Sequence, residues 1–403
     1  MVIIMANVSS SNGLEKRPKL RFPGFDEPWQ STLLSSVFAK NTKKNTNGQI
    51  TNVICNSAKQ GLIPQREYFD KDIANSDNTS GYYIIEENDF VYNPRKSSDA
   101  PYGPISSYKY PDAGIVSPLY LCFRAKGAIN PSFYEWYFRS SAWHRYVYMS
   151  GDSGARHDRV SIKDDVFFAM PISIPSAREQ EHIASFLDMI DQRIDKQRAL
   201  VDNLKKYKRG VLHAILHQKI RFKNTTGQEY PVWHQYTIAE IAECLDRKRV
   251  PITSNERIRG IYPYYGANGI QDYVSGYIFD GEFVLLAEDG GHFNDFSVEP
   301  IAQYVSGRVW VNNHAHILRA KCNTRFLYYS LVHKDIRNYI NNPSRGKLNQ
   351  EDMQSIVIDI PCDEEQRRIV EFMEHIDHHI EVNSNELTHL LNIKKFLLQQ
   401  LFI

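Results

Sequence analysis

The sequence predicts an α+β fold in which two β-rich domains are each followed by a long helix. The two helices are expected to pair as an antiparallel coiled coil with pseudo-twofold symmetry. Three observations lead to this prediction: an internal repeat, two long segments with the same apolar spacing, and strand-like runs between dense turn residues. The expected order is an N-terminal tail (1–19), a first domain (20–173), a central helix (174–217), a second domain (218–359) and a C-terminal helix (360–403).

The repeat is clearest where each helix begins. Residues 174–194 (IPSAREQEHIASFLDMIDQRI) align without a gap with residues 360–380 (IPCDEEQRRIVEFMEHIDHHI), at an offset of 186. Nine of the 21 pairs are identical, whereas average composition predicts roughly one match by chance. With small gaps the repeat extends upstream, where residues 124–126 match 319–321, 89–91 resemble 282–284, and 20–22 with Trp29 resemble 220–222 with Trp233.

Both long segments carry a narrow apolar seam with spacings of three and four, which is typical of paired helices. The seam is interrupted at matched polar positions, Gln197 with Asn383 and Lys208 with Lys394. Each helix alone would more simply pack on its own domain, but two regular seams in one chain favour pairing. The residues expected to pair are Ile183, Leu187, Ile190, Ile194, Val201 and Leu204 in the first helix, and Ile369, Met373, Ile376, Ile380, Leu387 and Leu390 in the second.

The first helix is expected to begin with a capping box, because Ser176 precedes Glu179 by three residues. Between the helices, strand-like runs alternate with turn residues, and two aromatic segments have the spacing of amphipathic helices. The strand-like runs are residues 82–93, 114–124, 277–287 and 314–320, and the aromatic segments are 133–147 and 325–340.

Composition excludes several classes of protein. The 403 residues are 42% hydrophobic, which suits packed domains, and the net charge of +1 says little about partners. Five cysteines without a CxxC spacing argue against disulfides and a zinc site, and for a reducing compartment. The N-terminal tail lacks the pattern of a signal peptide, and no apolar stretch reaches membrane-spanning length. A cytoplasmic location without membrane contact is therefore expected.

The sequence offers little catalytic chemistry. It has no glycine-rich nucleotide-binding motif and no evident pair of nucleophile and base, so no catalytic residue is predicted. His314 and His316 alternate along a strand, but no third ligand has suitable spacing, so no metal is expected. Acidic residues on the helix flanks, Asp188, Asp191, Glu374 and Asp377, are interpreted as solvated.

Recognition of nucleic acid remains as the leading function. Arginine, asparagine and glutamine can pair with base edges, and lysine and arginine anchor phosphates. Each single residue is more simply explained as solvated surface, whereas the clusters are more indicative. The candidates are Lys43, Lys44, Lys59, Gln60, Tyr92, Asn93, Arg95, Lys96, Arg156 and Arg159 in the first domain, and Arg247, Lys248, Arg249, Arg257, Arg259, Tyr264, Tyr265, Asn268 and Arg345 in the second.

From about Leu20 to its end, the chain resembles the specificity subunits of type I restriction–modification systems. Each matching piece is weak alone, but their order and the two helix starts (IP followed by EQ) make the resemblance strong. The pieces are RFPGF at 21–25 with EPW at 27–29, GLIP at 61–64 followed by Tyr68-Phe69, DFVYN at 89–93, PYG at 101–103, SPLY at 117–120, YPYYGANGI at 262–270 and the Asp289-Gly290 turn.

The resemblance implies two target-recognition domains that each read half of a bipartite double-stranded DNA sequence, with the helices acting as a ruler. It also implies docking of two methyltransferase subunits, which hold S-adenosylmethionine, and two restriction subunits, which use ATP and Mg; this chain itself is expected to hold no cofactor. The family shares no fixed base-contacting residues, so none is carried over. The tail of about 19 residues departs from the family. The alternative is an assembly scaffold or inactive paralogue that does not bind DNA.

Overall fold

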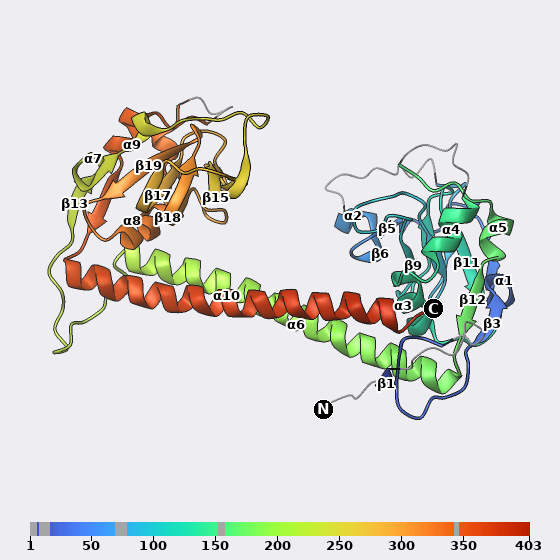
Figure 1. Ribbon diagram of the computed structural model, residues 1–403. Helices are drawn as coiled ribbons and strands as arrows, with labels where there is room; N and C mark the ends of the chain where they lie inside the picture. Colours follow the sequence, from blue (N-terminus) through green and yellow to red (C-terminus); the bar gives the residue numbers. More distant parts are fainter. Residues whose placement is uncertain (1–5, 8–16, 69–78, 152–157, 342–345) are drawn as a thin grey trace. The chain divides into compact units, whose positions relative to one another are not determined.

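The computed structural model describes residues 6–7, 17–68, 79–151, 158–341 and 346–403 (Figure 1). The chain divides into two compact units, unit 1 (Met1–Lys196 with Glu386–Ile403) and unit 2 (Gln197–Asn385). Both long helices, α6 (Ala177–Leu216) and α10 (Asp363–Gln400), therefore contribute one part to each unit. Within the described ranges, no helix has both the length and the apolar character needed to cross a membrane.

Unit 1 is built around a small antiparallel sheet covered by aromatic helices. Its core is a cluster of rings in which Phe38 packs edge-on against Phe90 and Phe123. The four-stranded sheet has the order β4 (Phe38–Lys40), β11 (Leu121–Ala125), β8 (Phe90–Tyr92), β9 (Ile105–Ser107). Two-stranded pairs are β3 (Gln30–Leu33) with β12 (Pro171–Ile174), β5 (Ile54–Ser57) with β6 (Gly61–Pro64), β7 (Tyr83–Ile85) with β10 (Gly114–Val116), and β1 (Ala6–Asn7) with β2 (Leu20–Arg21). The helices are α1 (Leu34–Val37), α2 (Gln65–Tyr68), α3 (Pro131–Arg139), α4 (His144–Ser150) and α5 (Asp164–Phe168).

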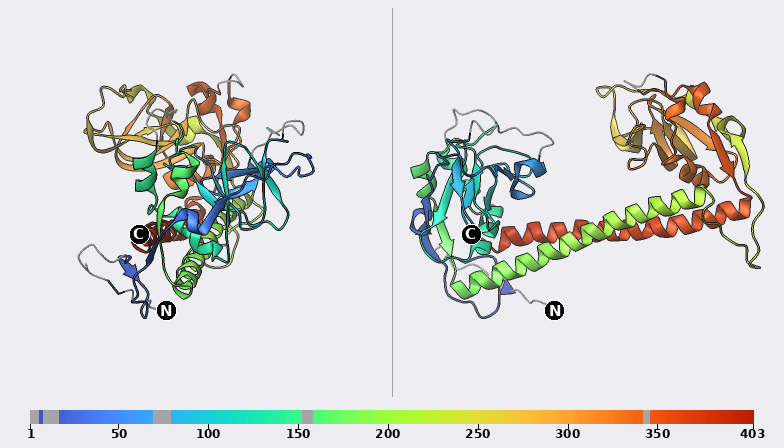
Figure 2. Two further views of the ribbon diagram at one scale, coloured as in Figure 1. Left: turned by 90° about the vertical axis from the view of Figure 1, so that its right-hand side faces the viewer. Right: turned by 180° about the vertical axis from the view of Figure 1, so that it is seen from behind.

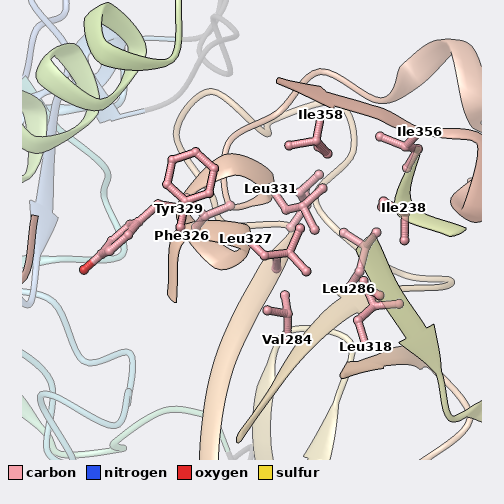
Figure 3. Close-up of a cluster of buried hydrophobic side chains, with 14 of the residues drawn as sticks. Ile238, Val284, Leu286, Leu318, Phe326, Leu327, Tyr329, Leu331, Ile356 and Ile358 are labelled. Atoms are coloured by element: carbon pink, nitrogen blue, oxygen red, sulfur yellow. The ribbon is translucent and has the colours of Figure 1, made fainter. Parts of the chain in front are cut away.

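Unit 2 repeats this plan with a larger sheet. Figure 3 shows part of its core, where Val284, Leu286 and Leu318 of the sheet face Phe326 and Leu327 of a helix. The six-stranded sheet has the order β14 (Ala242–Cys244), β19 (Ala315–Ala320), β17 (Phe279–Ala287), β18 (Ala302–Val311), β15 (Arg259–Gly266), β16 (Gly269–Val274). A separate pair joins β13 (His234–Thr237) to β20 (Val357–Ile360), and the short helices are α7 (Ile238–Ile241), η2 (Asp246–Lys248), α8 (Thr324–Leu331), η3 (Arg337–Tyr339) and α9 (Gln350–Ser355).

The two units confirm that the chain repeats itself beyond the helix starts. The order β4-β11-β8-β9 in unit 1 corresponds to β14-β19-β17-β18 in unit 2, and β3-β12 corresponds to β13-β20. Asn130 caps α3 by accepting from the Phe133 N–H, and Asn323 caps α8 by accepting from the Phe326 N–H, both at 3.0 Å. These matched caps set the offset between α3 and α8 at 193 residues.

The helices α6 and α10 pack together and run antiparallel in each unit (Figures 1 and 2). In unit 1, Arg193 pairs with Glu386 at 2.6 Å. In unit 2, the Gln197 amide donates to Asn383 Oδ1 at 3.0 Å. All the residues expected to pair are buried or half-buried, although the contact made by each stays a prediction: Ile183, Leu187, Ile194, Val201, Ile369, Met373 and Ile376 are buried, and Ile190, Leu204, Ile380, Leu387 and Leu390 are half-buried.

Each helix ends inside the core of the unit that it reaches last. Leu212 and Ile215, near the end of α6, are buried in the unit 2 core, and Leu397 and Leu401, at the end of α10, are buried in the unit 1 core. The C-terminus of the chain thus lies beside α3 in Figure 1. Because burial of a large aliphatic side chain contributes about 1.5–3 kcal/mol, these helix ends hold each unit together.

The aromatic segments are less helical than their spacing predicts. Residues 133–147 form α3 and α4 with a break between them, where the Ser140 hydroxyl and backbone N–H both turn back to the Tyr137 carbonyl. Residues 325–340 form α8 and then only the short η3. Serine competes for backbone hydrogen bonds in this way, and apolar spacing carries no information about it.

Candidate nucleic-acid interface and helix anchors

The start of α6 is anchored by a buried carboxylate. Glu179 accepts two hydrogen bonds from the Arg21 guanidinium, at 2.7 and 2.8 Å, and one from the Trp29 indole N–H at 3.3 Å. The expected capping box is only half formed, because the Glu179 N–H donates to Ser176 Oγ but the Glu179 side chain is taken by Arg21 and Trp29. A bidentate arginine–carboxylate pair fixes the orientation of the helix on its domain.

The start of α10 has the same anchor in unit 2. Glu365 accepts from Arg221 Nη2 at 2.8 Å, from Arg221 Nε at 3.2 Å and from the Trp233 indole N–H at 2.9 Å. The ion pair with Glu365 raises the pKa of the Arg221 guanidinium. The same contact of a glutamate with an upstream arginine and tryptophan therefore occurs at the start of both long helices.

A second device, which we call the clasp, joins the two helices in each unit. In unit 1 it consists of Lys394 of α10, Asp191 of α6 and Trp136 of α3, and in unit 2 of Lys208 of α6, Asp377 of α10 and Tyr329 of α8. Each lysine pairs with its aspartate and lies over the aromatic ring, 4.9 Å from the Trp136 centroid and 5.4 Å from that of Tyr329. Cation–π contacts of this kind add to an ion pair.

The clasp corrects the interpretation of the acidic helix residues as solvated. Asp191 and Asp377 pair across the helices, and Asp377 also accepts from the Tyr329 hydroxyl at 2.7 Å. Asp188 accepts from the Trp136 indole N–H at 2.7 Å, and Glu374 pairs with Arg325 at 2.7 Å. The polar breaks in the seam at Lys208 and Lys394 are thus specific interhelical contacts.

In the first domain the structure brings three candidate cations together. Arg95 and Arg159 form an antiparallel backbone bridge, and the Lys96 N–H donates to the Asp158 carbonyl at 2.8 Å. Arg95 and Lys96 are exposed, and the half-buried Arg159 has its Nε 4.0 Å from Asp158, with no hydrogen-bond acceptor for that atom among the described residues. Exposed Lys59 and Gln60 lie at the turn between β5 and β6, with Lys59 3.7 Å from Asp99. Arg156 lies outside the described residues.

Other candidates of the first domain have structural partners. Tyr92 is buried and its hydroxyl donates to the Tyr102 carbonyl at 2.8 Å, so its side chain is not accessible to DNA. The half-buried Asn93 donates to the Asn56 carbonyl at 3.2 Å. Lys43 is exposed and 3.3 Å from Glu86, and Lys44 is exposed.

In the second domain the basic run at 247–249 divides into two roles. Arg247 and Lys248 are exposed on η2. The Arg249 guanidinium is half-buried, pairs with Glu288 at 2.6 Å and Asp246 at 3.3 Å, and donates to the Ala315 carbonyl at 2.9 Å. These contacts account for Arg249 as a structural residue.

Further candidates of the second domain surround the outer strands. Arg257 lies 4.3 Å over the ring of the buried Tyr264 and 3.5 Å from Asp272. Asn268 is exposed and donates to the Gly290 carbonyl at 2.9 Å. Arg259 is exposed and Tyr265 is half-buried, whereas Arg345 lies outside the described residues.

The structure adds polar residues that the sequence analysis did not select for this surface. Two hollows of about 360 and 310 Å³ share Gln271 and His314 in their walls. Asn268 lines the first hollow, and Arg257 and Asn313 line the second. Amide side chains can read adenine edges bidentately. In the sequence, the polar run 312–314 between two strands was the feature that could have indicated these residues.

The two histidines considered for a metal do not come together. His314 Nδ1 is 2.5 Å from Asp289 on the surface, whereas the buried His316 has Nδ1 2.5 Å from Asp246 and Nε2 2.9 Å from the Leu348 carbonyl. Cys244 lies beside His316 and Asp246, and both nitrogens of His316 lie at hydrogen-bonding distance from protein oxygen atoms, so these contacts account for the group without an ion. Burial raises the pKa of the Asp246 carboxyl, but bonds from His316 and Ile317 and the nearby Arg249 bring it below its usual value.

Comparisons with known proteins agree with this architecture. A profile described as the type I restriction modification DNA specificity domain matches residues 232–392. A protein of Haemophilus influenzae whose name assigns it as a type I restriction enzyme specificity subunit is 40% identical over 138 residues. That match covers 34% of this chain, and the chain spans about a third (35%) of the length of that relative.

Two solved structures share the fold over nearly their whole length. The crystal structure of the S subunit of a type I restriction–modification system from M. genitalium has a TM-score of 0.56 and 16% identity, covering 96% of this chain and 99% of that one. A chain in a structure described as the basis of complex assembly and conformational transition of the type I R-M system has a TM-score of 0.58 and 17% identity. That match covers 94% of this chain and 98% of the other. Residues 232–392 therefore match the DNA specificity domain of type I restriction–modification systems, and the repeated domain–helix plan is a fold that the chain shares with the solved S subunit.

Proposed function

We propose that this chain is the DNA sequence-specificity subunit of a type I restriction–modification complex. Residues 20–173 and 218–359 are its two target-recognition domains, and each recognises one half of a bipartite double-stranded DNA target. The observation that carries the proposal is the twofold use of the same anchor, Glu179 with Arg21 and Trp29, and Glu365 with Arg221 and Trp233. Two equivalent domains on two equivalent helices suit a target with two parts.

The proposed DNA-facing residues are those that are exposed and lack a role in the core. In the first domain they centre on the exposed Arg95 and Lys96, beside the half-buried Arg159, and include Lys59 and Gln60 at the turn between β5 and β6. In the second they are Arg247 and Lys248 together with the polar walls of the two hollows. Cations anchor phosphates without reading sequence, so base discrimination falls to the amide and imidazole groups, including Asn268, Gln271 and His314.

The remaining functions belong to partners. We propose that this chain docks two methyltransferase subunits that hold S-adenosylmethionine and two restriction subunits that use ATP and Mg, in the cytoplasm, and that it catalyses no reaction itself. The second candidate function, a scaffold or inactive paralogue that does not bind DNA, would leave the exposed cationic and amide clusters of both domains without a role. Removal of these clusters should abolish DNA binding if the first proposal holds.

An exchange of domains tests the proposal. Residues 20–173 are replaced by the same region of a related subunit, and the methylated motif of cells that express the complex is read by methylome sequencing. One half of the motif should change while the other half stays constant, and the reciprocal exchange of residues 218–359 should change the other half. Motifs altered in both halves, or in neither, would contradict domain-wise reading, and a complex that binds no DNA would favour the scaffold.

A further inference from the structure

Unit 2 contains a cavity of about 540 Å³ beside the last turns of α6. Its apolar wall includes Leu212 and Leu216 of α6, Trp233, and Ile358 of β20, and Ser330 of α8 also lines it. The volume lies in the usual range for a site that holds a ligand group. It opens to solvent, because the exposed His213, His217 and Asp335 also line it.

In unit 1 the equivalent place is occupied by aromatic side chains. There the Phe402 ring lies 5.7 Å from the Phe133 ring and 6.2 Å from the Tyr137 ring. The offset of 186 places Leu216 where Phe402 lies, and the offset of 193 places Ser330 where Tyr137 lies. Unit 2 therefore lacks two aromatic rings here, although Trp233, which lines the cavity, packs on Phe326 as Trp29 packs on Phe133 in unit 1.

Cationic side chains line the same cavity. Arg209 and Lys334 are both half-buried, and within the described residues neither side chain has an ion pair within 4.0 Å or a side-chain hydrogen bond. His213 and His217 stack beside them at 3.9 Å between ring centroids. Of the acids present, Asp335 is paired with Arg337 at 2.6 Å and Asp359 accepts from Gln235 at 3.0 Å.

Half-buried cations without partners are costly unless an anion meets them. Burial lowers the pKa of Lys334, and the nearby Asp359 and Asp335 offset this only in part. An aromatic side chain alone would satisfy the apolar wall and leave Arg209 and Lys334 unpaired. An anion alone would satisfy the cations and leave the apolar wall in contact with water.

We propose that this cavity is a docking site for a segment of a partner protein that carries an aromatic side chain flanked by carboxylates. The ring takes the space that Phe402 and Tyr137 fill in unit 1, and the carboxylates face Arg209 and Lys334. This inference is independent of DNA reading by the two domains, since it concerns residues outside the proposed DNA-facing set.

The test uses the full chain and the peptide acetyl-Glu-Asp-Phe-Glu-Asp-amide, with binding followed by calorimetry. A version with Ala in place of Phe and the version acetyl-Lys-Lys-Phe-Lys-Lys-amide are the matched controls. Because burial of a large apolar side chain contributes about 1.5–3 kcal/mol, the Ala version should bind about ten- to a hundredfold more weakly. The lysine version should bind at least about tenfold more weakly, because its charges repel Arg209 and Lys334.

Two variants locate the binding. Leu216→Phe with Ser330→Tyr rebuilds the aromatic filling of unit 1 and should abolish binding of the Phe peptide. Arg209→Gln with Lys334→Gln should remove the preference for acidic over basic peptides while retaining the preference for Phe over Ala. If the filled variant fails to fold, as judged by circular dichroism, Ser330→Tyr alone replaces it, and the charge variant still tests the site.

Several outcomes would overturn the proposal. These are equal binding of the Phe and Ala peptides, undiminished binding by the filled variant, or no binding of any peptide. A dimer of the chain that the filled variant dissociates, seen by analytical ultracentrifugation, would assign the cavity to a second copy instead. DNA binding is measured separately with the complex of the unsubstituted chain, so failure here and failure of the proposed function are distinguishable.

Discussion

Lys208 of α6 and Asp377 of α10 form an ion pair in unit 2 that is repeated by Lys394 and Asp191 in unit 1. In each case the lysine comes from one helix and the aspartate from the other, and the partners stand at matched positions of the repeat. The lysines interrupt the apolar seam, so the same residues that weaken hydrophobic packing fix the register of the helices. A polar residue in an apolar seam commonly specifies register at a cost in stability.

The first prediction concerns this pair. Lys208→Met and Asp377→Asn should each lower the free energy of unfolding by about 1–2 kcal/mol, a range discounted for the partial exposure of Asp377. The double variant should lose less than the sum, because both changes remove the same interaction. Chemical denaturation of the four proteins gives the coupling energy. Lys206→Met, at an exposed position of the same helix, is the control, and strictly additive losses would show that the pair contributes nothing.

The second prediction concerns the seam itself. Ile190 is half-buried against the unit 1 core and Ile376 is buried in the unit 2 core. Replacing both with Asp should remove about 1.5–3 kcal/mol of burial at each position and bury charge in addition, so helix pairing and assembly of the complex should be lost. Val382→Asp, at an exposed site of α10, should leave assembly intact. Copurification of the subunits measures both, and an intact complex with the double variant would count against the seam.

The sequence repeat was sufficient to predict the architecture, because a repeated Ile-Pro and Glu-Gln at two helix starts requires two similar surroundings. It could not show what the repeated Glu does: a Ser three residues before Glu179 satisfies the pattern of a capping box, while its true partners Arg21 and Trp29 lie 158 and 150 residues away. The roles of Asp191 and Asp377 were missed for the same reason. Helical spacing shows which residues share one face of a helix, but it does not show which residues of other elements contact that face. The basic run at 247–249 looks like one cluster in the sequence, whereas in the structure Arg247 and Lys248 are exposed and Arg249 is half-buried.

The third prediction separates those residues. Removing Arg247 and Lys248 together should flatten the dependence of log K on log[salt] by about 0.9 for each phosphate that they neutralise, without changing the preferred motif. Arg249→Ala should instead lower the free energy of unfolding by about 2–4 kcal/mol, because it leaves Glu288 and Asp246 without their cation. Binding of the assembled complex across a salt series, with denaturation of each variant, distinguishes the two effects. An unchanged salt slope in the double variant would show that Arg247 and Lys248 are only solvated.

The last prediction concerns His333, whose ring hydrogen-bonds the Phe296 carbonyl at 2.7 Å. Burial, with a contribution from the nearby Arg209 and Lys208, lowers the pKa of His333 below the usual value for histidine. Between that lowered pKa and the unfolded value of about 6.5, the unfolded chain binds more protons than the folded one, so stability falls as the pH falls through this window.

His333→Asn keeps an amide donor for the carbonyl and removes the titration. The loss of unfolding free energy between about pH 7.5 and about pH 5 should therefore be smaller in this variant than in the natural chain. His375→Asn, at an exposed site of α10, is the control for replacing a histidine by asparagine. Equal losses in the His333 variant and the natural chain would show that this imidazole does not govern the acid sensitivity of unit 2.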